Sequence, residues 1–411
     1  MKLFCTPTME KKYAIECQTQ YKRINPLRVQ TVPRGIIFPL ELSETNMHEQ
    51  NQYGGVCDEN LQFVELSLTK RVSPPNFTSE FVDWFKGANP AYAIDGIDFV
   101  DETVVFIGAL PKHFGHYILE GLSRLWFLLD QQNLETYRCV CISDDDEDRF
   151  AEFLRLFGLP AERITRVVKP TMFKEVIVPE QSIRLHDFYS KEYKATIERI
   201  MVNVHPVQND KVYFSKKERK NDRAIGERPL EQILARNGYS VYYPERMSVG
   251  EVLSVVKGCN LFVATSGTNI HNSLFLRHNS RMVCLNRSEH YHPIQIMIDR
   301  MNGLNVSYVD AYIFGSKANW SNGPFFLFPT NGIRRFFSSE AMTFSVLYLY
   351  GAYPRYLFVY MIRLVRRYII ETLRSVLSRM QRSSCGVFRH IATSVLRQRM
   401  GVAASEASTK V

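Results

Sequence analysis

A run of small and polar residues in the second half of the chain lies between a buried strand and a helix. The strand is predicted over Leu261–Ala264, and Thr265-Ser266-Gly267-Thr268-Asn269 leads directly into a helix-like segment, Ile270–Leu276. Such a turn leaves backbone N–H groups without intrahelical partners, where a diphosphate accepts hydrogen bonds and is stabilised by the helix dipole. The run therefore predicts a diphosphate site formed by Ser266, Gly267, Thr268 and Asn269.

Cations follow an earlier strand of the same predicted sheet. The strand Val212–Phe214 runs into a basic segment that contains Lys216, Arg219 and Arg223. Carboxyl ends of parallel strands meet at one edge of a sheet, so these cations are positioned to neutralise that diphosphate. Lys216 is a candidate for binding the diphosphate, and Arg219 and Arg223 are candidates for binding and catalysis. A solvated basic loop and an ordinary helix cap fit the same residues.

His116, Glu120 and Arg124 are four residues apart in the first half of the chain. They share one helix face if the periodic segment Tyr117–Asp130 is helical. A carboxylate four residues from a histidine orients the imidazole and raises its basicity, as a general base for an acceptor hydroxyl requires. In the alternative, Glu120 pairs with Arg124 on the helix surface and His116 only terminates the helix.

The order of these residues resembles glycosyltransferase family 61, in the form found in bacterial capsular and exopolysaccharide proteins. The resemblance extends over roughly Val104–Val309 and rests on two blocks. The blocks are Gly115-His116-Tyr117-Ile118-Leu119-Glu120 with Arg124-Leu125-Trp126, and Ser215-Lys216, Arg219, Arg223, Gly238-Tyr239, Pro244-Glu245, Ser248, Ser266-Gly267, Asn272 and Phe275.

This resemblance implies a GT-B-like α/β fold, with two Rossmann-like domains that face a cleft and the donor in the C-terminal one. The first block matches the family's His-x-x-x-acid pattern, which favours His116 and Glu120 as the catalytic base. Asn272 matches a family Asn and is a donor-binding candidate, with a helix cap or core hydrogen bond as its alternative. Glu245 is a candidate for holding the ribose or the base edge, or is an ordinary loop carboxylate. The sequence departs from the family at Ser266, where a His often precedes the glycine.

An acidic run, Asp144-Asp145-Asp146-Glu147-Asp148, follows another predicted strand. In the other main glycosyltransferase fold such carboxylates bind Mn²⁺ or Mg²⁺. Carboxylates are also favoured in the first turn of a helix, and one is predicted here over Glu147–Phe157. We interpret the run as a helix start and expect no essential metal and no cofactor. His290 and His292 lack further ligands and are expected to be loop histidines near the cleft.

Alternating strand and helix patterns divide the chain into segments. Runs such as Thr103–Ile107 and Tyr137–Ile142 predict buried strands in the first half, and Gly158 followed by Pro160 predicts a helix stop. A helical connector over Phe188–Val204 leads to the domain boundary. The predicted segments are a β-rich N-terminal segment that packs beneath the first domain (1–89), an acceptor-side Rossmann-like domain (90–206), a nucleotide-sugar-binding Rossmann-like domain (207–340) and a basic tail (341–411).

The net charge of +9 comes entirely from the tail. Residues 341–411 carry ten Arg and one Lys against Glu371 and Glu406, and the remaining chain is balanced. The globular part therefore has no excess of positive charge for a nucleic-acid groove. Eight cysteines without metal-ligand spacing favour a reducing compartment. We expect no signal peptide, because Met1–Ile15 lacks an apolar core, and no membrane span.

The tail has the pattern of a basic amphipathic helix. Tyr368-Ile369-Ile370, Leu373 and Val376 recur at helical spacing with arginines interleaved. Such a helix lies in a membrane interface, with arginines on anionic headgroups. A helical pair that closes the second domain, or a dimer contact, is the alternative. The tail thus predicts a cytoplasmic protein that is peripheral on the inner face of the cell membrane.

Together these features predict an inverting glycosyltransferase. It would move a sugar from a nucleotide-sugar donor to a hydroxyl of a growing surface polysaccharide or a polyprenyl-linked glycan, and it would bind no nucleic acid. One alternative is a non-catalytic sugar-nucleotide-binding or scaffold protein of the same pathway, and another is a basic membrane adaptor. The sugar, the base, the acceptor and the oligomeric state do not follow from the sequence.

Overall fold

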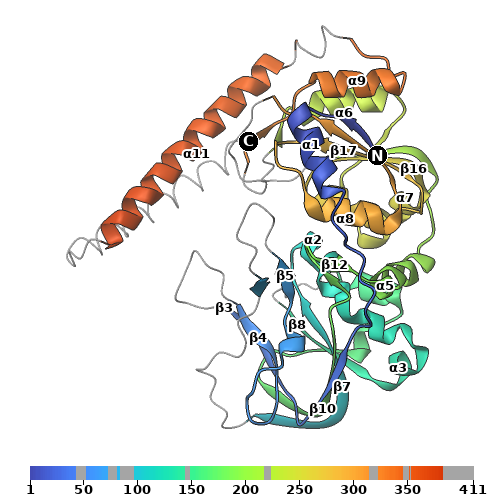
Figure 1. Cartoon of the computed structure of the whole chain (residues 1–411), viewed down its shortest axis with the longest axis vertical. Helices are drawn as coiled ribbons and strands as arrows, with labels where there is room; N and C mark the ends of the chain where they lie inside the picture. Colours follow the sequence, from blue (N-terminus) through green and yellow to red (C-terminus); the bar gives the residue numbers. More distant parts are fainter. Residues whose placement is uncertain are drawn as a thin grey trace. The chain divides into compact units, whose positions relative to one another are not determined.

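The structure is a computed structural model of the 411-residue chain. It describes residues 1–42, 52–72, 81–83, 97–143, 149–216, 224–313, 323–345, 351 and 353–382 (Figure 1). Contacts divide the chain into two compact units, Met1–Tyr353 and Pro354–Val411, and each is described by itself. Two large β-sheets organise the first unit.

Six parallel strands form the sheet that carries the predicted diphosphate turn. Their order is β15-β13-β16-β17-β18-β1, so β15 and β16, the next two strands of this sheet in sequence, lie on opposite sides of β13. The predicted strands Val212–Phe214 and Leu261–Ala264 lie inside β13 and β16, because a run that is apolar on both sides suits a sheet covered on both faces. The strands are β1 (Lys2–Phe4), β13 (Asn209–Phe214), β15 (Ser240–Tyr242), β16 (Cys259–Thr265), β17 (Arg281–Asn286) and β18 (Asn305–Asp310).

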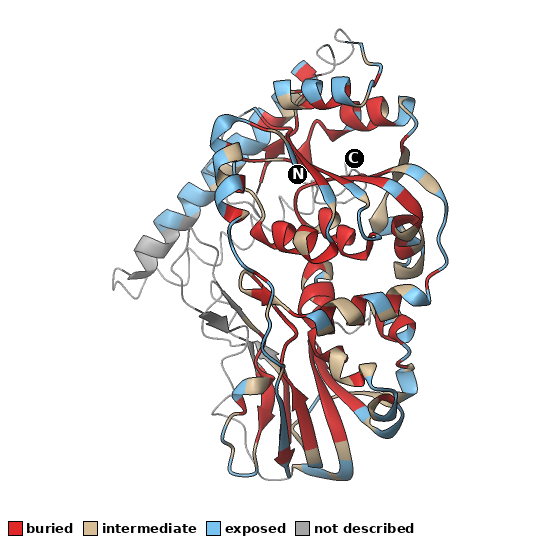
Figure 2. Ribbon diagram, turned by 45° about the vertical axis from the view of Figure 1, so that its right-hand side comes forward, coloured by how far each residue is buried: buried red, intermediate tan, exposed pale blue. Residues whose placement is uncertain are grey.

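Helices cover both faces of this sheet. Side chains alternate between the faces along each strand, so Val212 and Phe214 join one core cluster with α7, α8 and η5, and Tyr213 joins another with α6 and α9. Figure 2 shows the strands as predominantly buried and the outer turns of the helices as exposed. The elements are the α-helices α6 (Glu227–Arg236), α7 (Val249–Gly258), α8 (Pro293–Asn302) and α9 (Asn331–Ser339), and the 3₁₀ helices η4 (Pro244–Arg246) and η5 (Thr268–Phe275).

A mixed sheet of seven strands organises the first half. Its central strands β10, β7, β8 and β9 are parallel, and β2, β3 and β4 add antiparallel pairings. The predicted helix stop at Gly158 is confirmed, because Gly158 ends α4 with φ of 100°. The strands are β2 (Val29–Pro33), β3 (Ile36–Leu42), β4 (Gln52–Cys57), β7 (Asp98–Leu110), β8 (Arg138–Ser143), β9 (Ile164–Arg166) and β10 (Thr171–Pro179).

Short elements complete the first half and the junction. The helices are α2 (Phe114–Leu119), α3 (Gln131–Thr136), α4 (Glu152–Phe157), α5 (Lys191–Val202), and the 3₁₀ helices η1 (Glu65–Ser67), η2 (Gly121–Leu129) and η3 (Ala161–Arg163). Three two-stranded ribbons pair β5 (Lys70–Val72) with β6 (Phe81–Asp83), β11 (Ile183–Arg184) with β12 (Phe188–Tyr189), and β14 (Ala224–Ile225) with β19 (Phe325–Phe326).

The N-terminal segment divides between the two sheets, and the expectation that it packs wholly beneath the first half is wrong. Strands β2 to β4 do join the first sheet, but β1 pairs with β18 in the second. Helix α1 (Pro7–Glu16) follows, and Tyr13 OH donates to Asn286 Oδ1 at 2.8 Å. The Thr6 backbone N–H donates to Asp310 Oδ2 at 2.8 Å. This segment therefore occupies the carboxyl ends of β17 and β18.

The two halves of the first unit share one apolar core. Phe153 of α4 stacks on Phe275 of η5 with ring centroids 5.5 Å apart. The Gly250 backbone N–H at the start of α7 donates to Glu152 Oε2 at 2.9 Å. Because α5 also packs against η5, the connector predicted before residue 206 contributes to this junction. The halves are therefore held by burial as well as by the chain.

The second unit contains one long helix in its described part. Helix α11 (Tyr353–Arg382) begins at Tyr353, whose OH donates to the Gly226 backbone oxygen at 3.1 Å within the first unit. None of the helices among the described residues is long and apolar enough to span a membrane. Residues 383–411 of the predicted tail lie outside the described residues.

Candidate active site

The carboxyl ends of β13 and β16 form a topological switch point of the second sheet. Connections leave β13 toward β15 on one side, and β16 lies on the other, as in the flavodoxin-like strand order 2-1-3-4-5. The register pairs Phe214 with Ala264, so Lys216 and Ser266 follow at the same edge. Ligands of open α/β sheets bind in this place. The structure thus brings two of the predicted donor-binding segments together.

Two cations converge on Gly267. Lys216 Nζ lies 3.5 Å from the Ser266 backbone oxygen, and the Arg287 backbone N–H donates to Ser266 Oγ at 3.3 Å. A Cβ placed on Gly267 would lie 2.7 Å from Arg287 Nη2 and 3.2 Å from Lys216 Nζ. Gly267 also has φ of +109°, a region that favours glycine. The turn therefore needs glycine, and positive charge surrounds it.

Arg287 is a site residue that sequence reasoning missed. It directly follows β17, and its guanidinium carbon lies 4.2 Å from the centroid of the Phe325 ring. This stacking holds a planar donor group in place beside the turn. The sequence signal that could have identified Arg287 is its position directly after a strand, which it shares with Lys216. Of the predicted cations, Arg219 and Arg223 lie outside the described residues.

His116 and Glu120 form the predicted imidazole–carboxylate pair. Glu120 Oε2 lies 2.6 Å from His116 Nδ1. The Glu120 side chain is 2% exposed and that of His116 is 27% exposed, so the carboxylate supports the imidazole from the protein interior. Glu120 Oε1 is buried and has no hydrogen-bond partner among the described residues. A buried carboxylate that contacts Nδ1 fixes the orientation of the ring. It makes Nε2 the nitrogen that would exchange a proton with a bound molecule.

Arg124 does not share this face, and both expectations for it are wrong. Helix α2 ends at Leu119, and η2, with about 3 residues per turn, rotates Arg124 away from Glu120. Its guanidinium donates to the backbone oxygens of Pro179 and, at 2.7 Å, Leu68. Burial lowers the pKa of Arg124 to about 9. Arg124 therefore ties η2, which follows the His116 helix, to the end of β10 and to the end of η1.

The His116 segment and the Gly267 turn meet. A Cβ placed on Gly115, the residue before His116, would lie 3.3 Å from Thr268 Cγ2, and α2 packs against η5. The rings of His113 and His116 are 5.0 Å apart on the α2 side. The candidate site is therefore the set His116, Glu120, Lys216, Gly267, Thr268 and Arg287.

Two further imidazoles lie close to these cations. His271 and His292 have ring centroids 4.7 Å apart. Burial lowers the pKa of His271 to about 4, and the positive charge of Lys216 acts in the same direction. Burial also lowers the pKa of His292, helped by His271 and by Arg287. The surroundings of the turn thus favour neutral imidazoles and added negative charge.

The remaining predicted donor-binding residues differ in their surroundings. Asn272 is buried, and its Nδ2 donates to the Asn269 backbone oxygen at 2.9 Å, which supports the structural alternative for its amide nitrogen. Asn272 Oδ1 and Asn269 Nδ2 are buried without hydrogen-bond partners among the described residues. Glu245 is exposed on η4, after β15. The predicted α-helical start after Gly267 is instead the 3₁₀ helix η5.

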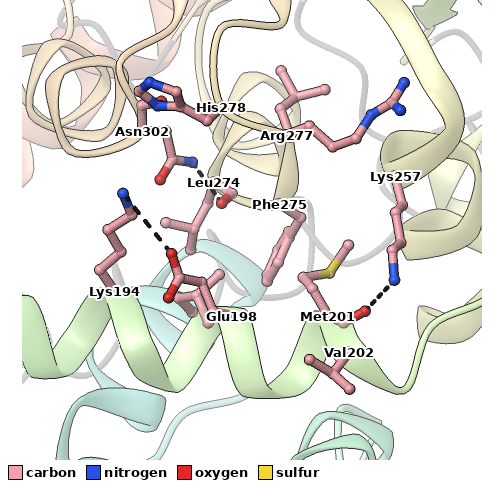
Figure 3. Close-up of a pocket in the computed structure, with 12 residues that line it drawn as sticks. Lys194, Glu198, Met201, Val202, Lys257, Leu274, Phe275, Arg277, His278 and Asn302 are labelled. Atoms are coloured by element: carbon pink, nitrogen blue, oxygen red, sulfur yellow. Dashed lines mark hydrogen bonds and ion pairs between the residues drawn. The ribbon is translucent and has the colours of Figure 1, made fainter.

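A pocket of about 290 Å³ lies at the opposite end of η5, and none of the predicted site residues lines it. Figure 3 shows Phe275 beside Met201, and Leu274 on the side of Lys194 and Glu198. Two of its polar side chains are already engaged: Lys257 Nζ donates to the Val204 backbone oxygen at 2.8 Å, and His278 Nδ1 to that of Asn302 at 2.8 Å. The pocket belongs to the junction between α5 and the second half.

Among the described residues, no group of three His, Cys, Asp or Glu side chains is arranged to hold a metal ion. The acidic run 144–148 lies outside the described residues. The absence of an essential metal therefore stays a prediction.

Comparison with known proteins gives one family match. Residues 114–283 match the family model described as Glycosyltransferase 61. The match begins at α2 and ends in β17, so it contains His116, Glu120, Lys216 and Gly267 but not Arg287. It supports a glycosyltransferase activity and the family resemblance of the sequence blocks. No curated protein matches the chain.

Proposed function

We propose that the protein is an inverting glycosyltransferase of GT-B architecture. It takes a sugar from a nucleotide-sugar donor and attaches it to a hydroxyl of a growing surface polysaccharide or lipid-linked glycan, as in the capsular and exopolysaccharide members that its sequence blocks resemble. The observation that carries the proposal is the contact between Gly115 and Thr268. It supports a site in which a His116–Glu120 base faces a cationic diphosphate turn.

The donor occupies the switch point in this proposal. Its diphosphate accepts hydrogen bonds at the Ser266–Gly267 turn and pairs with Lys216 and Arg287. Both cations are held beside Gly267, so they need little reorganisation when charge grows on the diphosphate. Fixed charges that interact more strongly with the departing group than with the bound donor lower the barrier.

The acceptor hydroxyl approaches from the side of α2. His116 Nδ1 faces Glu120, so Nε2 takes the hydroxyl proton as the acceptor oxygen attacks the anomeric carbon. The new glycosidic bond forms while the bond between the anomeric carbon and the diphosphate oxygen breaks. The bonding electrons leave with the nucleoside diphosphate. Attack from the face opposite the diphosphate inverts the anomeric configuration.

A thermal-shift screen tests the donor proposal. We expect one nucleoside diphosphate and its nucleotide sugar to raise the melting temperature of the full chain, because a ligand that binds only the folded state stabilises it by mass action. UDP, GDP, CDP, ADP and dTDP and their common sugars form the panel. If none of them shifts the transition, the donor site is wrong. If a nucleotide sugar binds but no acceptor glycan supports turnover, whether or not EDTA is present, a non-catalytic binding protein is the better interpretation.

The C-terminal helix is proposed as a peripheral membrane anchor. A stripe of apolar side chains along α11 is at least 45% exposed in each case, and its members are spaced three and four residues apart. Arg363 and Arg367 lie on the same helix, away from this stripe. An apolar face beside arginines suits the interface of an anionic membrane. The stripe consists of Phe358, Ile362, Val365, Ile369, Leu373 and Val376.

Vesicle flotation tests the anchor. Truncation is made after Tyr353, because Met342 is buried in the second half and Thr343 hydrogen-bonds to Asn237 there. The truncated chain is expected to stop floating with vesicles that contain phosphatidylglycerol. Full-length Ile362→Asp is expected to do the same, whereas Ser375→Asp, on another face of α11, keeps binding. If these changes alter only the oligomeric state, the stripe is a dimer contact.

A further inference from the structure

A chain of buried hydrogen bonds fixes the orientation of His271. His271 Nδ1 lies 2.9 Å from Gln295 Oε1. Gln295 Nε2 donates to Ser273 Oγ and to Asp299 Oδ1, each at 2.7 Å. Tyr308 OH donates to the other carboxylate oxygen of Asp299. All of these side chains except that of Tyr308, which is in β18, lie on η5 or α8, and all are buried.

The network determines which nitrogen of His271 carries the proton. Burial raises the pKa of Asp299 to about 7, so above that pH its carboxylate is an acceptor. If the Gln295 amide were reversed, its oxygen would face this carboxylate, and two acceptors would oppose each other. Oε1 therefore faces His271 and accepts from Nδ1–H. The other nitrogen, Nε2, then carries a lone pair and accepts hydrogen bonds. The chain of contacts thus makes His271 an acceptor in one fixed direction.

His271 and His116 differ in what lies behind the imidazole. A carboxylate contacts His116, and it stabilises the charge that the ring gains on taking a proton. A neutral amide contacts His271, which is also 4% exposed and close to Lys216. Environments that separate two like groups in this way assign them different tasks. His116 suits proton transfer, whereas His271 suits hydrogen bonding in its neutral form.

We propose that His271 is a specificity-determining residue of the donor site, whose Nε2 accepts a hydrogen bond from a hydroxyl of the transferred sugar. This inference rests on the proposed function. His271 lies four residues beyond Gly267, one 3₁₀ turn from Thr268, and near the cations that surround the diphosphate turn. A sugar attached to that diphosphate presents hydroxyl donors, for which a neutral imidazole is a complement. Gln295 acts through His271 and is a positioning residue.

The difference in affinity between a nucleotide sugar and its nucleoside diphosphate measures this contact. UDP-glucose, UDP-N-acetylglucosamine and GDP-mannose, each beside its diphosphate, are titrated calorimetrically into the full chain. For the sugar that binds, His271→Phe is expected to reduce the difference about tenfold and leave diphosphate affinity unchanged. His271→Gln, which can donate inward and accept outward, should restore most of it. His278→Gln, three residues beyond the end of η5, serves as the matched control.

The outcomes separate this inference from the proposed function. If no nucleotide binds the wild type, both fail. If the diphosphate binds and His271→Phe keeps the full difference in affinity between the nucleotide sugar and its diphosphate, only the role of His271 is overturned. The same holds if His278→Gln has an equal effect, because the loss would then be a general effect of altering η5.

Gln295→Glu provides a readout that a purely structural role would not change. A carboxylate at this position favours the charged imidazole, which donates from Nε2 and cannot accept. In this variant the difference in affinity between the nucleotide sugar and its diphosphate should therefore be small at pH 6 and increase as the pH rises. His271 of the wild type should stay neutral between pH 6 and 8, because burial lowers its pKa to about 4, whereas the pKa of Asp299, which burial raises to about 7, lies in this window in both proteins. The other groups around the ring are Asp299, Lys216, His113, His116 and His292. Parallel profiles in the two proteins would overturn the inference.

Discussion

His116→Ala is expected to lower kcat by about 10²- to 10⁴-fold while leaving the affinity for the nucleoside diphosphate unchanged. The imidazole is 27% exposed and bonded through Nδ1 to a buried carboxylate, which is the arrangement of a supported base. Removing it deletes proton transfer without touching Lys216 or Gly267. Single-turnover rates with a fixed acceptor, together with calorimetric titration of the diphosphate, measure the two effects separately.

Glu120→Gln separates basicity from geometry. The amide oxygen can still accept from His116 Nδ1, so the ring keeps its place, but the negative charge that stabilises the imidazolium is lost. A smaller fall in kcat, about 10²-fold, is expected. His205→Ala, which removes an exposed histidine, is the control. Wild-type turnover in both site variants would show that another group takes the proton.

Removing either cation beside Gly267 is expected to weaken nucleoside diphosphate binding by about 10- to 100-fold. Charge-assisted hydrogen bonds to a phosphate have free energies of about 1.5–3 kcal/mol. Lys216→Met and Arg287→Met keep most of each apolar stem and remove the charge. Arg287→Met also loses its stacking on Phe325 and is expected to have the larger effect. Calorimetric titration of the diphosphate identified in the screen gives both values.

Arg281→Met is the matched control for Arg287. Arg287 directly follows β17, whereas Arg281 is the first residue of that strand and pairs with Glu340. Its replacement should leave diphosphate affinity unchanged. If Arg281→Met and Arg287→Met weaken binding equally, the effect is one of net charge and the carboxyl edge of the sheet is not the phosphate site. Melting temperatures of the three variants without ligand show whether folding is affected.

The strands of the second sheet followed from local pattern. Val212–Phe214 and Leu261–Ala264 are short runs of apolar, β-branched or aromatic residues, and both lie inside observed strands. A strand buried on both faces requires such a run wherever it occurs in a chain. The same reasoning placed Lys216 and Ser266 after strand ends, and hence at one edge of the sheet.

The local geometry of η2 and η5 could not be predicted from the sequence pattern. Both η2 and η5 have apolar residues at helical spacing, but over two or three turns a period of about 3 cannot be told from 3.6. Packing decided between them. In η2 the difference moves Arg124 from the side of Glu120 to the carbonyl oxygens of Pro179 and Leu68.

Contacts between segments that are distant in the sequence could not be predicted from local hydrophobic periodicity either. Strand β1 pairs with β18 across some three hundred residues, and no periodicity in Lys2–Phe4 indicates that partner. Arg287 joins Lys216 at Gly267 for the same reason, since each follows a different strand and only the sheet order brings them together.

The sequence by itself determined the alternation of strands and helices, the candidate base His116 with Glu120, and a glycine turn with a cation at one sheet edge. These features depend on local periodicity and on residue type. Only the tertiary structure decided that Arg287 joins the turn, that Thr268 meets the His116 helix, and that Gln295 fixes the proton of His271. Those pairings depend on which buried polar groups find partners once the segments pack, and burial is a property of the whole fold.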